Sequence, residues 1–131
     1  MKNIAIVILN WNGKGYLEQF LPSVICHSSD ARIIVADNGS TDGSIDFLKN
    51  NFPSIERIEL DKNYGFAGGY NEALKQVNSE FYLLLNSDIE VTENWLEPLM
   101  ETMIDPTIAG CQPKVLAYHN KTFFEHAGAS G

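Results

Sequence analysis

The chain alternates between short apolar runs and stretches in which apolar residues recur at helical spacing. The apolar runs, at 4–9, 32–37 and 81–85, predict strands, and alternating apolar residues predict another at 55–60. Runs of this length are typical of strands that are buried on both faces of a sheet. A weaker strand is predicted over 108–116, where a proline interrupts the pattern.

Each predicted strand is followed by a segment with helical periodicity. These segments predict helices over 16–25, 45–52, 70–77 and 95–103, the last capped by Thr92 and ended by Pro106. Such alternation indicates an α/β fold, a mainly parallel β-sheet flanked by helices in three layers. The 131 residues suit one domain with a single core.

Polar residues follow the predicted strands at the points where the apolar runs end. Asn10, Asp37, Asp61 and the sequence Asn86-Ser87-Asp88 all occupy such positions. Because ligands of parallel α/β sheets bind beyond the carboxyl ends of the strands, we expect these residues to converge on one edge.

The Asn86-Ser87-Asp88 sequence is a candidate metal site. A carboxylate beside an amide oxygen can give a hard cation its first ligands, with phosphate oxygens and water completing the coordination. Alone, these three residues read more simply as a turn that caps the next segment. The other polar groups expected at the same sheet edge favour the interpretation as a metal site over that of a simple turn.

Two further features are candidate ligand contacts. Asp37 can accept hydrogen bonds from a ribose or a base, although a turn role is the alternative, and Asn10 with Trp11 can frame a base. The glycine-rich segment 65–71 opens a helix, whose N-terminus favours anions, but it matches neither the dinucleotide nor the Walker pattern. Turn geometry is therefore its default interpretation.

Composition narrows the function classes. The formal net charge is -8, with nine Lys and Arg against 17 Asp and Glu, so the chain lacks the basic surface that nucleic-acid binding needs. So few cations also make a divalent metal a natural partner for a phosphate ligand. Cys26 and Cys111 lie far apart and read as reduced thiols, which predicts a cytoplasmic protein, with peripheral contact at the inner face of the membrane left open.

Four motifs together resemble a known family. The sequences IVILNWNG, VADNGSTDGS, NYGFAGGYN and LLLNSD occur in this order between residues 6 and 88. They are similar to those of family-two glycosyltransferases of the GT-A fold, in particular the rhamnosyltransferase-like subgroup of bacterial surface polysaccharide synthesis. Residues 110–131 are also similar to the family.

The resemblance implies roles for individual residues. Asp88 matches the last aspartate of the family's DxD motif and would bind Mg²⁺ or Mn²⁺ on a diphosphate, while Asn86 stands where that motif often has aspartate. The residues that would bind the nucleotide or line the donor pocket are Asn10, Asp37, Gly68, Gly69 and Asn71.

The function implied is metal-dependent, inverting transfer of a hexosyl-type sugar. The donor would be a UDP- or dTDP-linked sugar and the acceptor a saccharide or a lipid-linked hydroxyl. The family's catalytic base is expected beyond Gly131, so we expect a truncated domain that is itself inactive. Glu90 or Glu125 would be the first candidates for a base if it were active.

Two alternatives remain open, as does the oligomeric state. A nucleotidyltransferase would carry a basic glycine loop after the first strand, which Gly13-Lys14-Gly15 faintly matches, and a non-catalytic nucleotide-binding module would need no base. A sheet edge left uncovered would also predict a homodimer through residues 108–124.

Overall fold

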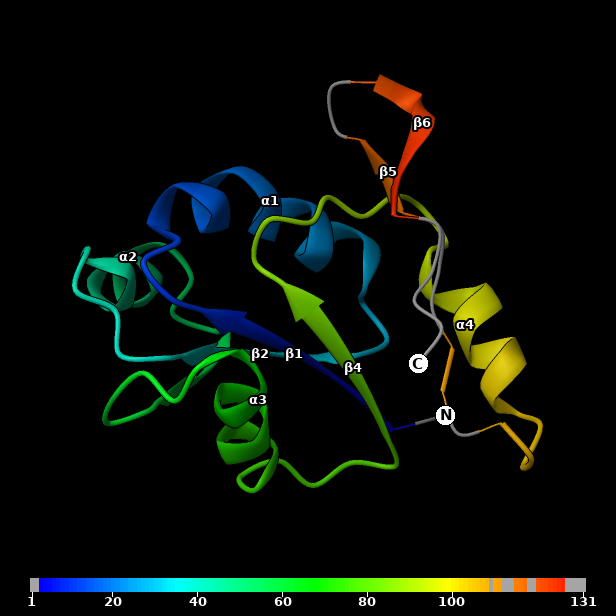
Figure 1. Ribbon diagram of the computed structural model, residues 1–131, viewed down its shortest axis with the longest axis horizontal. Helices are drawn as coiled ribbons and strands as arrows, with labels where there is room; N and C mark the ends of the chain where they lie inside the picture. Colours follow the sequence, from blue (N-terminus) through cyan, green and yellow to red (C-terminus); the bar gives the residue numbers. More distant parts are fainter. Residues whose placement is uncertain (1–2, 109, 112–114, 118–119, 127–131) are drawn as a thin grey trace. The chain divides into compact units, whose positions relative to one another are not determined.

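The structure, a computed structural model, describes residues 3–108, 110–111, 115–117 and 120–126, and side chains only as far as Cys111 (Figure 1). The chain divides into two compact units, Met1–Val91 and Thr92–Gly131. Each unit is described by itself below.

The first unit contains the predicted alternation of strands and helices. Its elements are β1 (Ile4–Asn10), α1 (Lys14–His27), β2 (Arg32–Asp37), α2 (Ser44–Asn51), β3 (Glu56–Glu59), α3 (Phe66–Leu74) and β4 (Phe81–Asn86). The strands form one parallel sheet in the order β3-β2-β1-β4. The prediction of a parallel α/β sheet is confirmed.

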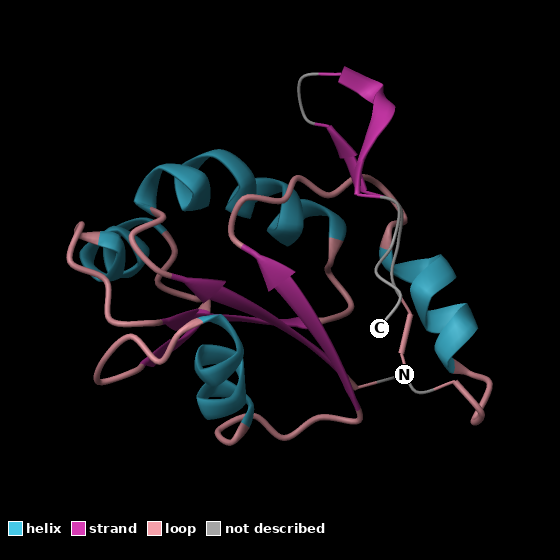
Figure 2. Cartoon of the chain, in the orientation of Figure 1, coloured by secondary structure: helices cyan, strands magenta, loops and turns pink. Residues whose placement is uncertain are grey.

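Helices cover both faces of this sheet, as Figure 2 shows, with α1 and α2 on one side and α3 on the other. On the α3 side, alternate residues of β1 and β2, such as Val7 and Ile34, pack against Tyr70, Ala73 and Val77. On the other side α1 buries a stripe at helical spacing, Leu17, Phe20, Leu21 and Val24. The three-layer arrangement follows from this two-sided burial.

The strand order creates a topological switch beside β1. The chain moves outward from β1 to β2 and β3, and after α3 it returns to the opposite side of β1 as β4. In open parallel sheets the crevice at such a switch is where ligands bind. The carboxyl ends of β1 and β4 lie at this switch point.

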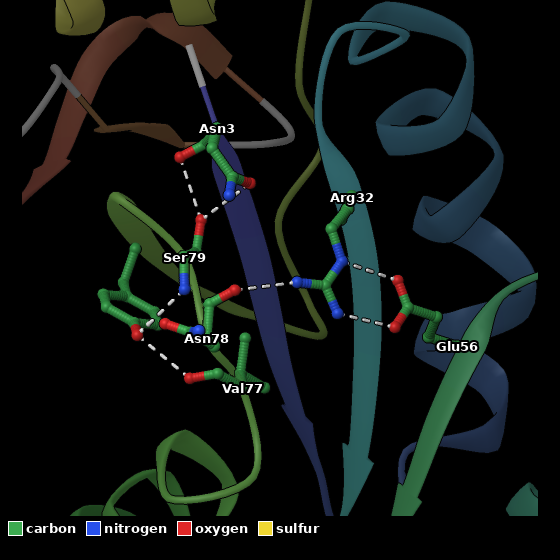
Figure 3. Close-up of polar contacts among 7 residues, drawn as sticks. Asn3, Arg32, Glu56, Val77, Asn78 and Ser79 are labelled. Atoms are coloured by element: carbon green, nitrogen blue, oxygen red, sulfur yellow. Dashed lines mark hydrogen bonds and ion pairs between the residues drawn. The ribbon is translucent and has the colours of Figure 1, made fainter.

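A group of hydrogen bonds links the strands at the opposite, amino-terminal end of the sheet (Figure 3). Arg32 donates from Nε and Nη2 to the two Glu56 carboxylate oxygens, at 3.0 and 2.8 Å, and from Nη1 to the Asn78 carbonyl at 3.1 Å. Ser79 Oγ donates to the Asn3 carbonyl at 2.9 Å. These bonds join β2 to β3 and tie the turn before β4 to the start of β1.

The second unit differs from expectation. It contains α4 (Leu96–Met103) and an antiparallel hairpin of β5 (Val115–Ala117) and β6 (Asn120–His126). The strand predicted over 108–116 is wrong at Ile108, Gly110 and Cys111, which are not in a strand, and its positions 109 and 112–114 lie outside the described residues.

The predicted cap of the last helix is also wrong. Trp95, not Thr92, occupies the N-cap position of α4, and no side chain caps it, because residues 92–95 form a turn of their own. The helix ends before Pro106, as predicted. In the described part of the chain, no helix is both long enough and apolar enough to cross a bilayer.

Candidate functional site

The polar residues at the strand ends do meet at one edge of the sheet. Asn10 and Asp37 are direct register partners at the ends of β1 and β2. On the other side of β1, Leu9 pairs with Asn86, the last residue of β4. Three adjacent strands therefore deliver Asn10, Asp37 and Asn86 to the same edge, as the parallel arrangement requires.

Asn10 and Asp37 form a buried polar network with the loop that follows β2. Asn10 Nδ2 donates to Asp37 Oδ1 at 3.1 Å and to Ser40 Oγ at 3.3 Å, and the Ser40 amide donates to Asp37 Oδ2 at 2.8 Å. Both Asn10 and Asp37 are fully buried. Each carboxylate oxygen of Asp37 thus has one protein donor and keeps further acceptor capacity.

One atom of this network lacks a partner. Asn10 Oδ1 is buried and accepts no hydrogen bond from the part of the protein that the structure describes. It faces Gly13, where an added Cβ would lie 2.5 Å from Asn10 Oδ1 and 3.1 Å from Ser87 Oγ. A buried acceptor without a partner costs about 1–3 kcal/mol, so Asn10 Oδ1 has acceptor capacity left for a donor group at this edge of the sheet.

Asn38, which was not singled out in the sequence, holds the loop that leads into α3. Its Nδ2 donates to Asn63 Oδ1 at 3.2 Å and to the Gly65 carbonyl at 3.0 Å, and its Oδ1 accepts from the Tyr64 amide at 2.9 Å. The sequence does carry one indication of this role, because an asparagine directly after a strand commonly hydrogen-bonds to nearby backbone groups.

The glycine-rich segment brings the start of α3 to the same edge. Gly65 adopts a left-handed φ of 80°, and no side chain caps the helix that follows. Gly69 is buried so closely that a Cβ would lie 2.8 Å from Asn38 Nδ2 and 2.9 Å from Leu9. Gly69 thus allows α3 to approach the ends of β1 and β2, whereas a Cβ at Gly68 would lie 3.2 Å from Tyr64 Cβ and Asn71 is exposed.

The end of β4 carries the candidate metal residues. Asn86 and Asp88 are exposed and Ser87 is half-buried. The Tyr70 hydroxyl, from α3, lies 3.0 Å from the Leu85 carbonyl and 3.2 Å from Asn86 Oδ1. The pKa of Tyr70 is raised to about 12, mainly by burial and in smaller part by the nearby charge of Asp88.

These residues fit a cation that is shared with a phosphate ligand. Nowhere in the described ranges do three or more His, Cys, Asp or Glu gather as a metal-binding group. Protein ligands at the end of β4 would be limited to the Asp88 carboxylate and the Asn86 amide. A Mg²⁺ or Mn²⁺ ion there would complete its shell with phosphate oxygens and water.

Two aromatic side chains beside these strand ends are strongly exposed. Trp11 follows β1 and is 54% exposed, and Phe66 opens α3 and is 65% exposed, with its ring edge-on to Tyr70. Trp11 is therefore not a packing residue of the core. Exposed rings of this size beside polar strand ends can stack on a planar ligand.

Residues 5–128 match the family model described as glycosyl transferase family 2, nearly the whole chain. The chain belongs to this family.

Among its curated relatives is TuaG of Bacillus subtilis, named for teichuronic acid biosynthesis. It is 29% identical over 110 residues, which cover 81% of this chain and 44% of TuaG. A second is the GalNAc(5)-diNAcBac-PP-undecaprenol beta-1,3-glucosyltransferase of Campylobacter jejuni, 29% identical over 106 residues, 77% of this chain and 34% of that protein. The chain spans less than half the length of these relatives.

Solved structures share the fold. TarS of S. aureus in complex with UDP has a TM-score of 0.65 at 24% identity, over 79% of this chain and 32% of that chain. The mannosyltransferase PcManGT of Pyrobaculum calidifontis, in complex with GDP-Man and Mn²⁺, has a TM-score of 0.73 at 19% identity, over 82% of this chain and 34% of its own. These likenesses confirm the GT-A-like α/β fold expected from the sequence motifs.

Proposed function

We propose that this chain is the donor-binding part of an inverting, metal-dependent glycosyltransferase of polysaccharide assembly, with rhamnosyl-type transfer as its sequence motifs imply. The observation that carries the proposal is the convergence of Asn10, Asp37 and the Asn86–Asp88 segment at the topological switch point of a family 2 fold. Ligand-bearing crevices of parallel sheets lie at this position.

The proposed donor lies across the three strand ends. Its base and ribose occupy the ends of β1 and β2, beside the Asn10–Asp37 network, with Trp11 available to stack. Its diphosphate lies between the start of α3, at Gly68, Gly69 and Asn71, and the end of β4. The N-terminus of α3 carries no side-chain cap, so its backbone N–H groups are suited to an anion.

The end of β4 would hold the cation through Asp88, with Asn86 beside it. A bound Mg²⁺ or Mn²⁺ supplies electrostatic stabilisation of the departing diphosphate. With nine Lys and Arg in a chain of net charge -8, few cationic side chains are available for that task.

The proposed nucleotide is UDP or dTDP, and the acceptor a saccharide or lipid-linked hydroxyl. TarS binds UDP whereas PcManGT binds GDP-Man, so the same fold accepts different bases. A cytoplasmic location, at the inner face of the membrane for a lipid-linked acceptor, belongs to the same proposal. The free, exposed thiols of Cys26 and Cys111 fit a reducing compartment.

Donor binding and transfer are separable in this proposal. The general base is assigned outside residues 1–131, so the isolated chain should bind donor without transferring sugar. The absent base removes a contribution of about 10²–10⁴-fold in rate. Robust turnover by residues 1–131 would refute this assignment and make Glu90 and Glu125 the first variants to test.

Calorimetry with UDP, dTDP, GDP and UTP, each with Mn²⁺ and with EDTA, tests the function. We expect a nucleoside diphosphate to bind more tightly with Mn²⁺, and Asp88→Ala to remove that metal effect while the fold stays intact. Asp30→Ala is the matched control, since Asp30 is exposed and precedes β2 at the opposite end of the sheet.

Other outcomes point to other functions. Preference for UTP would favour a nucleotidyltransferase, although Gly13 of the candidate basic loop is buried against Asn10 and Ser87. No binding of any nucleotide would refute the proposal.

A further inference from the structure

The loop after β1 contains an asparagine in an unusual backbone conformation. Asn12 has a φ of 49°, in the left-handed region that residues with a side chain seldom adopt. In the described part of the chain, Asn94 is the one other residue besides glycine with a positive φ, at 58°. Such a conformation persists only where the surrounding structure holds it, and it is frequent at ligand sites. The contacts that hold Asn12 therefore indicate what this loop does.

Two hydrogen bonds hold Asn12, and both go to the loop after β2. Its backbone N–H donates to Ser40 Oγ at 2.9 Å, and its side-chain Oδ1 accepts from the Thr41 amide at 2.7 Å. Because both donors are backbone N–H groups, the direction of each bond is fixed, and Asn12 must turn its amide oxygen towards Thr41. The partners are 28 and 29 residues away in sequence, so these bonds join two loops and do not close a local turn.

The same join continues at the start of α1. The Lys14 amide donates to Asp42 Oδ2 at 3.0 Å, and Asp42 Oδ1 accepts from the Ser44 amide at 3.0 Å. The loop after β2 is thus itself ordered by Asp42. Asn12 is therefore attached to a fixed segment and not to a free loop.

The residue that this join presents is Trp11. On one side of it Asn10 is fully buried and bonded to Asp37, and on the other side Asn12 is bonded to Thr41. Trp11 itself is 54% exposed, so packing in the core does little to fix its ring. Its backbone is instead held from both neighbours against the loop after β2. An exposed aromatic ring on a held backbone is suited to a planar ligand.

We propose that Asn12 is a positioning residue which, through the bond from the Thr41 amide to its Oδ1, holds Trp11 in place to stack on the nucleobase of the donor. The inference rests on the proposed function and deepens it, because it gives the base a stacking surface that exists before the donor binds. Since Trp11 is already ordered, donor binding does not bear the entropic cost of ordering it.

Three substitutions separate the side chain of Asn12 from its backbone conformation. Asn12→Gly still allows a positive φ but loses Oδ1, Asn12→Asp keeps an oxygen acceptor, and Asn12→Ala loses both features. In the free protein we expect faster hydrogen exchange at the Thr41 amide and a lower ¹⁵N order parameter at the Trp11 indole N–H in the Ala and Gly variants. Asn12→Asp should retain the parent values of both.

Asn94→Ala is the matched control for these measurements. It removes the other left-handed asparagine, which lies in the second unit, and it should change neither readout. An unchanged Trp11 order parameter in Asn12→Ala would overturn the proposal. A parent-like order parameter in Asn12→Gly would overturn it as well, because the backbone conformation alone would then position Trp11.

Calorimetry with UDP and Mn²⁺ tests the consequence for binding, using dTDP or GDP if that is the nucleotide bound. Trp11→Ala should weaken binding about ten-fold, within the range of base–aromatic stacking. Asn12→Ala should lose most of the same factor, and it should have no further effect when combined with Trp11→Ala. A purely structural role, in which Asn12 supports Asn10 and Asp37, would weaken binding equally in both backgrounds and would overturn the proposal.

These results also separate this inference from the proposed function. A parent protein that binds no nucleotide would refute the proposed function, whatever the order of Trp11. Equal affinity of the parent and Asn12→Ala for a nucleotide that both bind would refute the role of Asn12 alone.

Discussion

Gly13→Ala should destabilise the protein through steric overlap at the seam between β1 and β4. The backbone permits the change, since Gly13 has a φ of -110°, within the range of ordinary residues. The obstacle is steric, because the new Cβ would lie 2.5 Å from Asn10 Oδ1 and 3.1 Å from Ser87 Oγ. Asn10 is fully buried and cannot move away into solvent.

The size of the destabilisation can be estimated from the displacement of the Asn10 side chain and the hydrogen bonds that it weakens. Inserting a carbon into a packed site costs about 1–3 kcal/mol, and displacing the amide weakens its bonds to Asp37 and Ser40, at about 1 kcal/mol each. The expected loss in free energy of unfolding is therefore about 3–5 kcal/mol. For a chain of this size, that lowers Tm by on the order of 10 °C.

Gly15→Ala is the matched control. Gly15 lies two residues further along, inside α1, and a Cβ there would have no neighbour within 4 Å. That variant should gain roughly 0.5–1 kcal/mol, because alanine is the better helix former. Urea unfolding followed by circular dichroism measures both, and equal stabilities for the two variants would refute the steric argument.

Three other outcomes are expected. Arg32→Ala should cost about 0.2–1 kcal/mol at pH 7, because the pair with Glu56 is half-exposed. The hydrogen bond from Arg32 lowers the pKa of Glu56, so the pair stabilises the fold above the ordinary Glu pKa of 4.5 and is lost as pH falls through the lowered value. Urea unfolding at pH 7 and pH 2.5 should then show a smaller difference from the parent at the lower pH. Asn38→Ala should release the loop that leads to α3, seen as faster hydrogen exchange at the Tyr64 amide, and unchanged slow exchange there would contradict the role of Asn38 in holding this loop. We also expect residues 1–131 to form a dimer through 108–124, which a monodisperse monomer in sedimentation velocity at high micromolar concentration would refute.

The first unit could be predicted because its signals are local. The central strands β1 and β2 are continuous apolar runs buried on both faces, and such runs are unambiguous when helical periodicity follows them. Parallel pairing then brings the strand ends together without further information. For this reason the placement of Asn10, Asp37 and Asn86 on one edge followed from the sequence alone.

The contacts that organise the site could not be predicted in the same way. Tyr70 and Asn38 act through bonds to Asn86 and to residues 63–65, and those bonds exist only once α3 lies against the sheet. Periodicity shows that Tyr70 faces the core, but it does not show which atoms the Tyr70 hydroxyl contacts. The β5–β6 hairpin was missed because its mixed polar and apolar residues lack the pattern of a buried strand.

The position of β1 in the sheet has a consequence for the order of events during synthesis. β1 leaves the ribosome shortly before β2, but its other partner, β4, lies 77 residues further along the chain, as in the pairs Ile4–Phe81 and Leu9–Asn86. At about 5–20 residues per second, one edge of β1 waits roughly 4–15 seconds for its partner. Contacts of such long sequence separation also form slowly because loop closure opposes them. The seam that contains Gly13, Asn10 and Ser87 is therefore the last part of the sheet to form, and a nascent chain cannot bind a ligand there before β4 has been made.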